Sequence, residues 1–316
     1  MHQASGNSLT GFFLALTTAV LWGMLPIALK VLLVELTANT ITWVRFLAAA
    51  IFVTVVLLKH RALPSLRQLK GKARWLLLIA IAGLLSNYIL YLMGLNLLSS
   101  ETAQVVIQLA PFLMMLGGIF IFRERLLLWQ KIGAATLVIG LLLFFNDRLF
   151  TLITQFGQDS IGVLLVVIAA VTWATYALAQ KQLLMHFNSQ QIMWFIYIAG
   201  ACCFMPFIEL SPVWQLTVVQ WGLLLFCCLN TIVAYGAFAE ALQHWEASKV
   251  SAVLAITPLL TILFANLAAW IWPAAPIPQA LNNWSIFGAV LVVIGSAVTA
   301  LAPMLKQWRL DNRSVA

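Results

Sequence analysis

Charged residues are scarce in this sequence. Only 8% of its 316 residues are charged, whereas 63% are hydrophobic and the mean hydropathy is +1.01. In a typical soluble globular domain about 25% of all residues are charged, and most of them lie on the solvated surface. The composition therefore excludes that class and predicts an all-α integral membrane protein.

Residues that do chemistry are also few. The four histidines are scattered at loop or terminal positions, and the four cysteines form two adjacent pairs inside apolar stretches, where they pack as small apolar residues. The sequence has no phosphate-binding loop, no paired carboxylates and no nucleophile with a nearby base. We therefore expect no metal site, no cofactor and no enzymatic activity.

Long apolar stretches dominate what is present. A bilayer core about 30 Å thick takes roughly 20 apolar residues per helix, and ten stretches approach or exceed that length. The predicted transmembrane helices span residues 9–34, 38–58, 75–97, 102–122, 130–146, 161–184, 190–210, 219–242, 247–272 and 284–305. The connections are too short to hold a soluble domain.

The basic residues indicate the orientation. Outside the spans, every lysine and arginine except Arg148 falls on one side of the membrane if both termini share that side. Cytoplasmic loops carry the excess of basic residues, so both termini are predicted to be cytoplasmic, in a plasma or bacterial inner membrane. The basic loop at residues 59–74 has no interleaved aromatic residues, so we expect the lipid bilayer and not nucleic acid as its partner.

The chain repeats itself at an offset of about 150 residues. The segment AVLWGMLPIALK at 19–30 matches AVTWATYALAQK at 170–181, which aligns Trp22 with Trp173. Further matches are Tyr88 with Tyr235, Pro111 with Pro258, and residues 133–140 with 288–295. The matches predict two five-helix repeats at residues 1–148 and 149–316. Because five is odd, the second repeat enters the membrane from the opposite side, an inversion typical of secondary transporters.

Several of these features together resemble a known family. The ten spans, the tryptophans in spans one and six, the prolines in spans four and nine, and FRERL at 122–126 resemble the ten-helix EamA-type members of the drug/metabolite transporter superfamily. The resemblance implies a transporter, commonly an exporter of amino acids or other small metabolites. The chain departs from the family where an acidic motif often closes span nine, since residues 268–276 are AAWIWPAAP.

Polar and aromatic residues recur at helical spacing along six of the spans. Lipid cannot satisfy these groups, so we expect their faces to line a substrate cavity, although each could instead join neighbouring helices. The predicted cavity residues are Trp22, Asn87, Tyr88, Tyr91, Gln108, Trp173, Tyr176, Asn230 and Tyr235. We expect Pro26, Pro111 and Pro258 to bend their helices.

Five charged residues are candidates for charge sites or gates. Arg45 lies about seven residues into its span, and exposure to lipid there would cost roughly 2.5–3.5 kcal/mol, unless the side chain reaches the outer interface. Lys30 and Lys181 lie near span ends and can reach water. Glu240 could pair with Lys181. Glu124, in FRERL, is either a gate or a charge anchor at the membrane surface.

Spans five and ten are less polar. Each has glycines seven residues apart, Gly133 with Gly140 and Gly288 with Gly295. This spacing favours close backbone packing, so we interpret both spans as scaffold or as the contact of a homodimer. Whether the chain is a monomer or a homodimer stays open.

Three functions remain compatible with the sequence. The first is a secondary transporter that exports amino acids or related metabolites by alternating access. The second is an importer or exchanger of an anionic metabolite, which Lys30 and Arg45 would serve. The third is a lipid-handling membrane protein, which we disfavour. The lining suits a small amphipathic or zwitterionic molecule, since such pockets combine apolar walls with a few polar groups.

Overall fold

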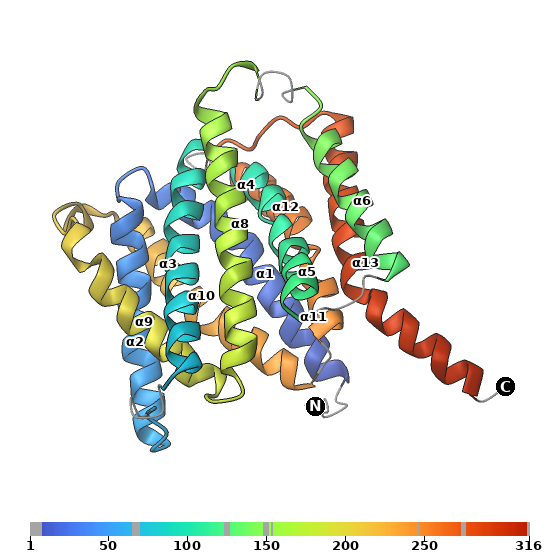
Figure 1. The fold of residues 1–316 in the computed structure, drawn as a ribbon. Coiled ribbons are helices and arrows are strands. Elements are labelled where there is room, and N and C mark those ends of the chain that lie inside the picture. The colour runs from blue at the N-terminus through green and yellow to red at the C-terminus, as the bar shows by residue number, and fades with distance from the viewer. Residues whose placement is uncertain are drawn as a thin grey trace.

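All secondary structure in the described part of the chain is helical. The computed structural model describes residues 8–64, 70–122, 127–147, 152, 154–244, 247–272 and 276–314. The long helices are α1 (Ser8–Leu32), α2 (Ala38–Lys59), α3 (Lys72–Leu97), α6 (Leu128–Phe144), α8 (Gln158–Leu183), α9 (Ser189–Phe204), α10 (Val218–His244) and α13 (Asn283–Ser314). Shorter helices are α4 (Ser100–Val106), α5 (Leu109–Phe122), α11 (Ala247–Leu254), α12 (Thr257–Ile271), η2 (Met205–Phe207) and η3 (Pro212–Gln215). Figure 1 shows them as one bundle.

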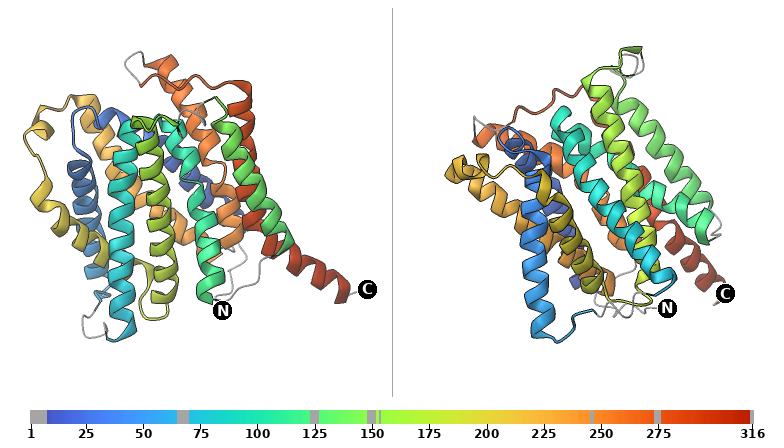
Figure 2. Two further views of the ribbon diagram at one scale, coloured as in Figure 1. Left: turned by 45° about the horizontal axis from the view of Figure 1, so that its top comes forward. Right: turned by 60° about the vertical axis from the view of Figure 1, so that its left-hand side comes forward.

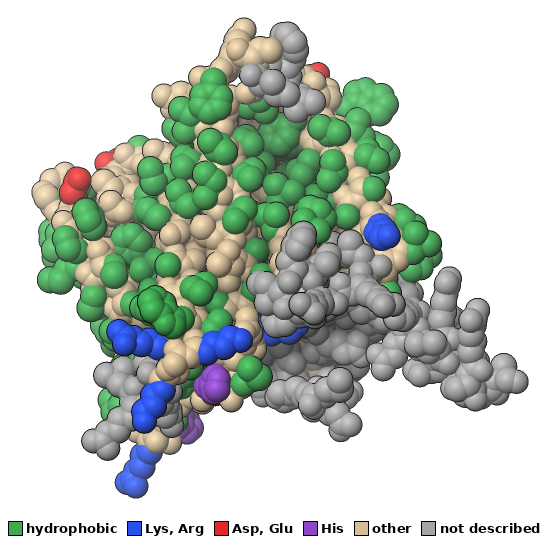
Figure 3. All heavy atoms as spheres, in the orientation of Figure 1, with side chains coloured by type: hydrophobic (Ala, Val, Ile, Leu, Met, Phe, Trp, Pro, Cys, Tyr) green, Lys and Arg blue, Asp and Glu red, His purple; other side chains and the backbone are tan. Residues whose placement is uncertain are grey.

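The helices match a membrane protein in length and composition. Within the described residues, eight segments are long and apolar enough to cross a bilayer, and α6 is a shorter apolar helix. Hydrophobic side chains cover much of the sides of the bundle that Figure 3 shows. An outer surface this apolar is unfavourable in contact with water and favourable in contact with lipid. The chain is an integral membrane protein.

Two of the predicted continuous spans are broken in the structure. Span 102–122 is divided into α4 and α5 at residues 107–108, and span 247–272 is divided into α11 and α12 at residues 255–256. Each break lies just before a proline, Pro111 or Pro258, which then sits in the first turn of the second helix. Proline has no N–H and its ring clashes with the carbonyl four residues earlier, so a continuous helix is disfavoured there. The prolines therefore accompany breaks where we expected bends.

Pro26 behaves differently, because α1 continues through it. Two neighbouring helices donate hydrogen bonds to α1 carbonyls in the turn before the proline. Asn230 Nδ2 of α10 donates to the Leu21 carbonyl at 2.6 Å, and Thr261 Oγ1 of α12 donates to the Gly23 carbonyl at 2.9 Å. The carbonyl that Pro26 leaves without its helical donor is that of Trp22, so these two contacts flank the position where the proline interrupts the α1 hydrogen bonds.

Most long helices pack closely against a helix from the other predicted half of the chain. The closest pairs join α1 to α10, α2 to α9, α3 to α8 and α6 to α13, and each pair takes one helix from either half. The views of Figure 2 keep α3 beside α8 and α6 beside α13. Smaller contacts join α4 to α12, α1 to α12 and α5 to α8. The hydrophobic core is therefore formed between the halves.

The glycines of α6 and α13 face each other. A Cβ atom on Gly133 would lie 2.7 Å from the Gly295 carbonyl oxygen, and one on Gly288 would lie 2.6 Å from that of Gly140. No side chain fits at those distances. The close backbone packing expected for spans five and ten is confirmed, and its partner is the other glycine-bearing helix of the same chain.

The two ends of the bundle differ in charge. Helix α1 begins and α13 ends at the lower end of Figure 1. Most of the lysine and arginine side chains visible in Figure 3 gather at that end, and the visible acidic side chains lie at the other. Lys59 in the last turn of α2 and Lys72 at the start of α3 belong to the basic end. We call the two ends the basic end and the opposite end.

Candidate functional site

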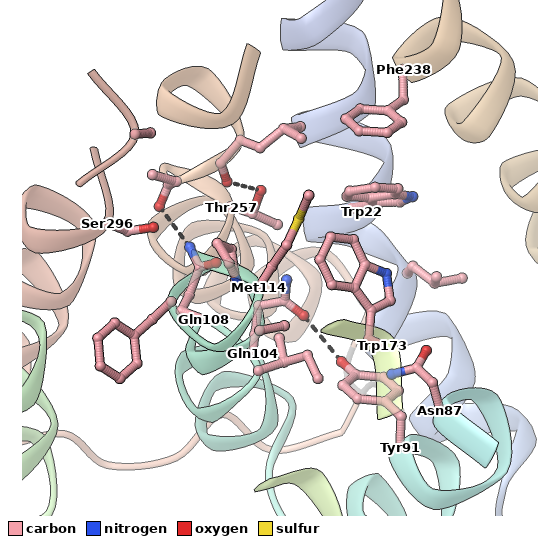
Figure 4. Close-up of a pocket in the computed structure, with 18 of the residues that line it drawn as sticks. Trp22, Asn87, Tyr91, Gln104, Gln108, Met114, Trp173, Phe238, Thr257 and Ser296 are labelled. Carbon is pink, nitrogen blue, oxygen red and sulfur yellow. Dashed lines mark hydrogen bonds between the residues drawn. The ribbon is translucent and has the colours of Figure 1, made fainter. Parts of the chain in front are cut away.

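A cavity of about 430 Å³ lies within the bundle, and helices from both predicted halves line it. Its lining includes seven of the nine predicted cavity residues, namely Trp22, Asn87, Tyr88, Tyr91, Gln108, Trp173 and Tyr235. Pro26 and Pro111 also line it, whereas Pro258 is buried outside it at the start of α12. Figure 4 shows the polar and aromatic side chains that face this space.

Aromatic rings form one wall of the cavity. Trp22 of α1 lies 5.4 Å from the ring of Tyr235 in an edge-to-face contact, and 5.8 Å from Phe238. Trp173 of α8 lines the same cavity and lies 6.5 Å from Tyr176. The two matched tryptophans therefore reach one cavity from opposite halves of the chain (Figure 4). Such rings offer flat apolar surface to a ligand.

The two helix breaks meet at the cavity. Ile107 and Gln108 from the first break line it, and so does Ala255 from the second. Gln108 Nε2 donates a 2.9 Å hydrogen bond to the Ala255 carbonyl, which links one break directly to the other. Broken helices with unwound backbone at a cavity are a feature of substrate sites in secondary transporters.

Two further amides are oriented by the protein. Asn87 Nδ2 donates to the Ala169 carbonyl at 2.9 Å, which joins α3 to α8. The Tyr91 hydroxyl donates to Gln104 Oε1 at 3.0 Å, as Figure 4 shows. These contacts hold neutral polar groups at the cavity surface, so they can offer hydrogen bonds without adding charge.

Arg45 is buried at the cavity. Its side chain is 2% exposed and lines the cavity, and its Nε donates to Thr231 Oγ1 at 2.9 Å. The guanidinium carbon lies 4.8 Å from the centre of the Tyr88 ring, a cation–π distance. Within the described residues, no carboxylate lies within 4.0 Å of it. The arginine is therefore embedded in the protein and does not extend to the interface.

Tyr176 and Asn230 lie outside the cavity lining. Tyr176 is 4% exposed, and its hydroxyl donates to Met193 Sδ at 3.3 Å in the core between α3, α8 and α9. Asn230 supports the α1 backbone at Leu21, as described above. Both side chains therefore contact a neighbouring helix and not the cavity.

The other charged candidates have structural partners. The Lys30 ammonium donates to the carbonyls of Leu95, Asn96 and Leu98 at 2.8–2.9 Å, and thereby caps the carboxyl end of α3. Glu240 Oε1 lies 3.3 Å from His244 Nε2 one turn later in α10, so the expected pair with Lys181 is replaced by this one.

Lys181 and Glu124 complete the predicted set. Lys181 lies in the last turn of α8, at the basic end, and lines the cavity. The cavity thus extends toward the basic end. Glu124 falls outside the described residues.

Comparison with known proteins decides the family. The profile of the EamA-like transporter family matches residues 9–146 and again residues 160–301. The chain belongs to this family. It is 44% identical over 297 residues to an "Uncharacterized transporter" of Haemophilus influenzae, covering 94% of this chain and 96% of that protein. It is 40% identical to the "Uncharacterized inner membrane transporter YhbE" of Escherichia coli, covering 95% and 93%.

More distant similarities extend over nearly the whole chain. A "Probable amino-acid metabolite efflux pump" of Escherichia coli is 24% identical, covering 94% of this chain and 95% of that protein. One crystal structure aligns with a TM-score of 0.64 at 19% identity, over 93% of this chain and 98% of that one. The EamA-type resemblance seen in the sequence is therefore confirmed, and the chain is a membrane transporter of this family.

Some residues of this EamA-like transporter's cavity were missed by sequence reasoning. Phe238 follows Tyr235 by three positions and shares its helix face, so helical spacing could have found it. Ser296 and Thr299 of α13 also line the cavity, although span ten was interpreted as scaffold. One face of α13 packs on α6 through glycine while an adjacent face meets the cavity.

The opposite end of the bundle carries a buried carboxylate that was also missed. Glu101 at the start of α4 is 2% exposed, and its Oε1 accepts a hydrogen bond from the Gln279 backbone N–H at 3.3 Å. Ser99 Oγ donates to Gln279 Oε1 at 2.6 Å, and Thr102 Oγ1 donates to the same oxygen at 2.5 Å. These contacts attach the segment before α13 to the start of α4.

Proposed function

We propose that this EamA-like transporter moves small organic metabolites across the plasma (inner) membrane by alternating access, and that it exports amino acids or related compounds. The observation that carries the proposal is the cavity itself. Both halves line it, and the two helix breaks meet there through Gln108 and Ala255. In secondary transporters the substrate binds at such a place, near the bilayer midplane.

The proposed architecture is ten spans in two inverted five-helix repeats, residues 1–148 and 149–316, with α4 plus α5 and α11 plus α12 each counted as one span. The helix contacts support this symmetry. If α1 corresponds to α8 and α3 to α10, then the contact of α1 with α10 repeats that of α8 with α3. A two-fold axis between the halves predicts such exchanged contacts.

The described conformation fits a state open to the cytoplasm. The cavity extends to Lys181 near the basic end, which the distribution of charge assigns to the cytoplasm. Contacts close the opposite end, where Lys30 caps α3 and Gln279 attaches to α4. We propose that these contacts open when the cavity turns outward.

The lining supports a small amphipathic substrate. Aromatic rings and aliphatic side chains surround a few neutral amides, which suits an amino acid better than a bare metal ion. The relative named as an amino-acid metabolite efflux pump supports the same substrate class. The embedded Arg45 favours a second candidate, the import or exchange of an anionic metabolite.

Transport by purified protein in proteoliposomes tests the proposal. Vesicles are loaded with unlabelled amino acids, and the uptake of trace labelled amino acid is measured by counterflow, with empty liposomes as the control. We expect saturable counterflow for at least one amino acid. Counterflow confined to non-amino-acid organic anions would favour the second candidate, and no flux across the whole panel would contradict both.

Labelling of two single cysteines tests the architecture. Lys70→Cys lies between α2 and α3, and Ile277→Cys lies before α13, where Ile277 is 92% exposed. In a background without the native cysteines, an impermeant thiol reagent should label Ile277→Cys from outside intact cells. Lys70→Cys should be labelled only after the membrane is opened. Labelling of both positions from the same side would contradict the inverted repeat.

A further inference from the structure

Among the described residues, a positively charged group faces the cavity of this transporter without a negatively charged partner. Arg45 is 2% exposed within α2. Within the part of the chain that the structure describes, its only hydrogen-bond partner is Thr231 and no carboxylate approaches it. Buried charges are normally paired, because an unpaired charge loses its hydration without compensation. The unpaired guanidinium therefore points to a partner that comes from outside the chain.

The protein holds the guanidinium in one orientation. Thr231 accepts from Nε and itself donates to the Cys227 carbonyl at 2.9 Å, so its hydroxyl is fixed. The Tyr88 ring lies against the guanidinium at 4.8 Å. An arginine has five N–H donors, and the Nε contact uses one of them. The donors of the two terminal nitrogens remain for a ligand.

Those terminal nitrogens reach the cavity. The fully buried side-chain atoms that lack a partner in the described residues belong to Thr42, Tyr88 and Asn230, and none belongs to Arg45. Since Arg45 lines the cavity, its terminal nitrogens have access to that space.

The cavity has the electrostatics of an anion site. Among its described lining residues, Arg45 and Lys181 are basic and none is acidic. The position that matches Arg45 in the second half is Ile196, which is fully buried, so the symmetry of the fold does not require an arginine here. The charge is therefore a property of the site and not of the scaffold.

We propose that Arg45 binds the carboxylate of the transported molecule through its two terminal nitrogens, while the apolar part of that molecule lies against the aromatic wall at Trp22 and Trp173. A guanidinium matches a carboxylate in a planar two-bond arrangement. We infer a carboxylate and not a phosphate because the second basic residue, Lys181, lies at the basic end of the cavity. This inference rests on the proposed function, and it names the group that the site recognises.

Binding of matched ligands tests the proposal in the wild-type protein. The probes are 3-phenylpropionate and its amide, and L-phenylalanine and its amide, which differ only at the carboxyl group. Binding is measured in nanodiscs by thermal shift and by tryptophan fluorescence. We expect each acid to bind about 10- to 100-fold more tightly than its amide, since a hydrogen bond to a charged group contributes roughly 1.5–3 kcal/mol.

Variants assign the preference to Arg45. Arg45→Gln should bind the acid and the amide equally. Arg45→Lys should keep a smaller preference for the acid, because lysine retains the charge but cannot form the planar two-bond contact of a guanidinium. Arg74→Gln is the matched control, since Arg74 is exposed at the start of α3. If the Arg45 variants do not fold, bound 3-phenylpropionate should still protect Arg45 of the wild-type protein from phenylglyoxal, as measured by peptide mass spectrometry.

Each result has a defined meaning. Equal affinity for acids and amides in the wild-type protein, no binding of any probe, or an acid preference that survives in folded Arg45→Gln would overturn the proposal. When the Arg45 variants do not fold, absence of protection from phenylglyoxal has the same meaning. Arg45-dependent acid binding without amino-acid counterflow would support it while contradicting amino-acid export, so the two failures are distinguishable.

Discussion

A methyl group on Gly288 would collide with the backbone of α6. The added Cβ would lie 2.4 Å from the Phe144 nitrogen, 2.6 Å from the Gly140 carbonyl oxygen and 2.8 Å from the Leu143 carbonyl carbon. Real Cβ atoms essentially never come within 3.0 Å of heavy atoms outside their own residue and its chain neighbours. All three obstacles are backbone atoms, so no side chain can rotate away and the helices must separate.

The size of this effect follows from those distances. Relief of the collision requires about 1 Å of separation, and a gap of 0.5–1 Å forfeits roughly a quarter to a half of the dispersion energy of the atoms involved. Overpacking of this kind costs about 1–3 kcal/mol. We expect Gly288→Ala to lower the melting temperature by roughly 2–12 °C, at about 2–4 °C per kcal/mol.

Gly222→Ala is the matched control. Gly222 lies inside α10, and a Cβ there would meet nothing within 4 Å. Alanine is favoured over glycine in a helix by about 0.5–1 kcal/mol, so this variant should be as stable as the wild type or more stable. Melting is followed by fluorescence-detected size-exclusion chromatography. If Gly288→Ala melts at or above the temperature of Gly222→Ala, the inferred closeness of α6 and α13 is wrong.

Three further predictions concern the cavity and its supports. Trp22→Ala and Trp173→Ala should each reduce counterflow at normal expression, because each variant removes a large apolar ring from the cavity wall. Phenylalanine at either position should have a milder effect. Unchanged flux in the double alanine variant would exclude a role for the wall. Lys30→Met removes three hydrogen bonds to the end of α3, which should lower the melting temperature; an unchanged value would show that the cap contributes nothing. Asn230→Leu removes the hydrogen bond that joins α10 to the Leu21 carbonyl and should destabilise the protein, whereas retained stability with altered substrate affinity would place Asn230 at the substrate.

The prolines show how far the sequence alone could lead. Proline at positions 26, 111 and 258 marks helices that cannot be regular, since a missing N–H is a local property. Whether the helix continues or breaks depends on what surrounds it. Pro26 stays inside α1, where α10 and α12 donate hydrogen bonds to the turn before it, and no sequence pattern specifies those neighbours.

The cavity residues show the same division. Helical spacing predicted a shared cavity face for Trp22, Trp173 and Tyr91, because a helix turns through a fixed angle per residue, and all three side chains line the cavity. Tyr176 satisfies the same spacing argument but packs in the core beside α9. A polar or aromatic face inside a membrane bundle can meet either a cavity or another helix, and spacing does not distinguish the two.

The sequence by itself determined that this protein lies in a membrane and is helical, because hydropathy is a sum over neighbouring residues. It also determined the family, because the matched motifs lie in the chain itself. Tertiary structure decided where α4 and α11 end, that Gln108 joins the two breaks, and that Arg45 faces the cavity with no acidic partner in the part of the chain that the structure describes. These features depend on which helices lie side by side. That choice is made by contacts between distant residues, such as the glycines of α6 and α13, which allow two backbones to approach only in the folded bundle.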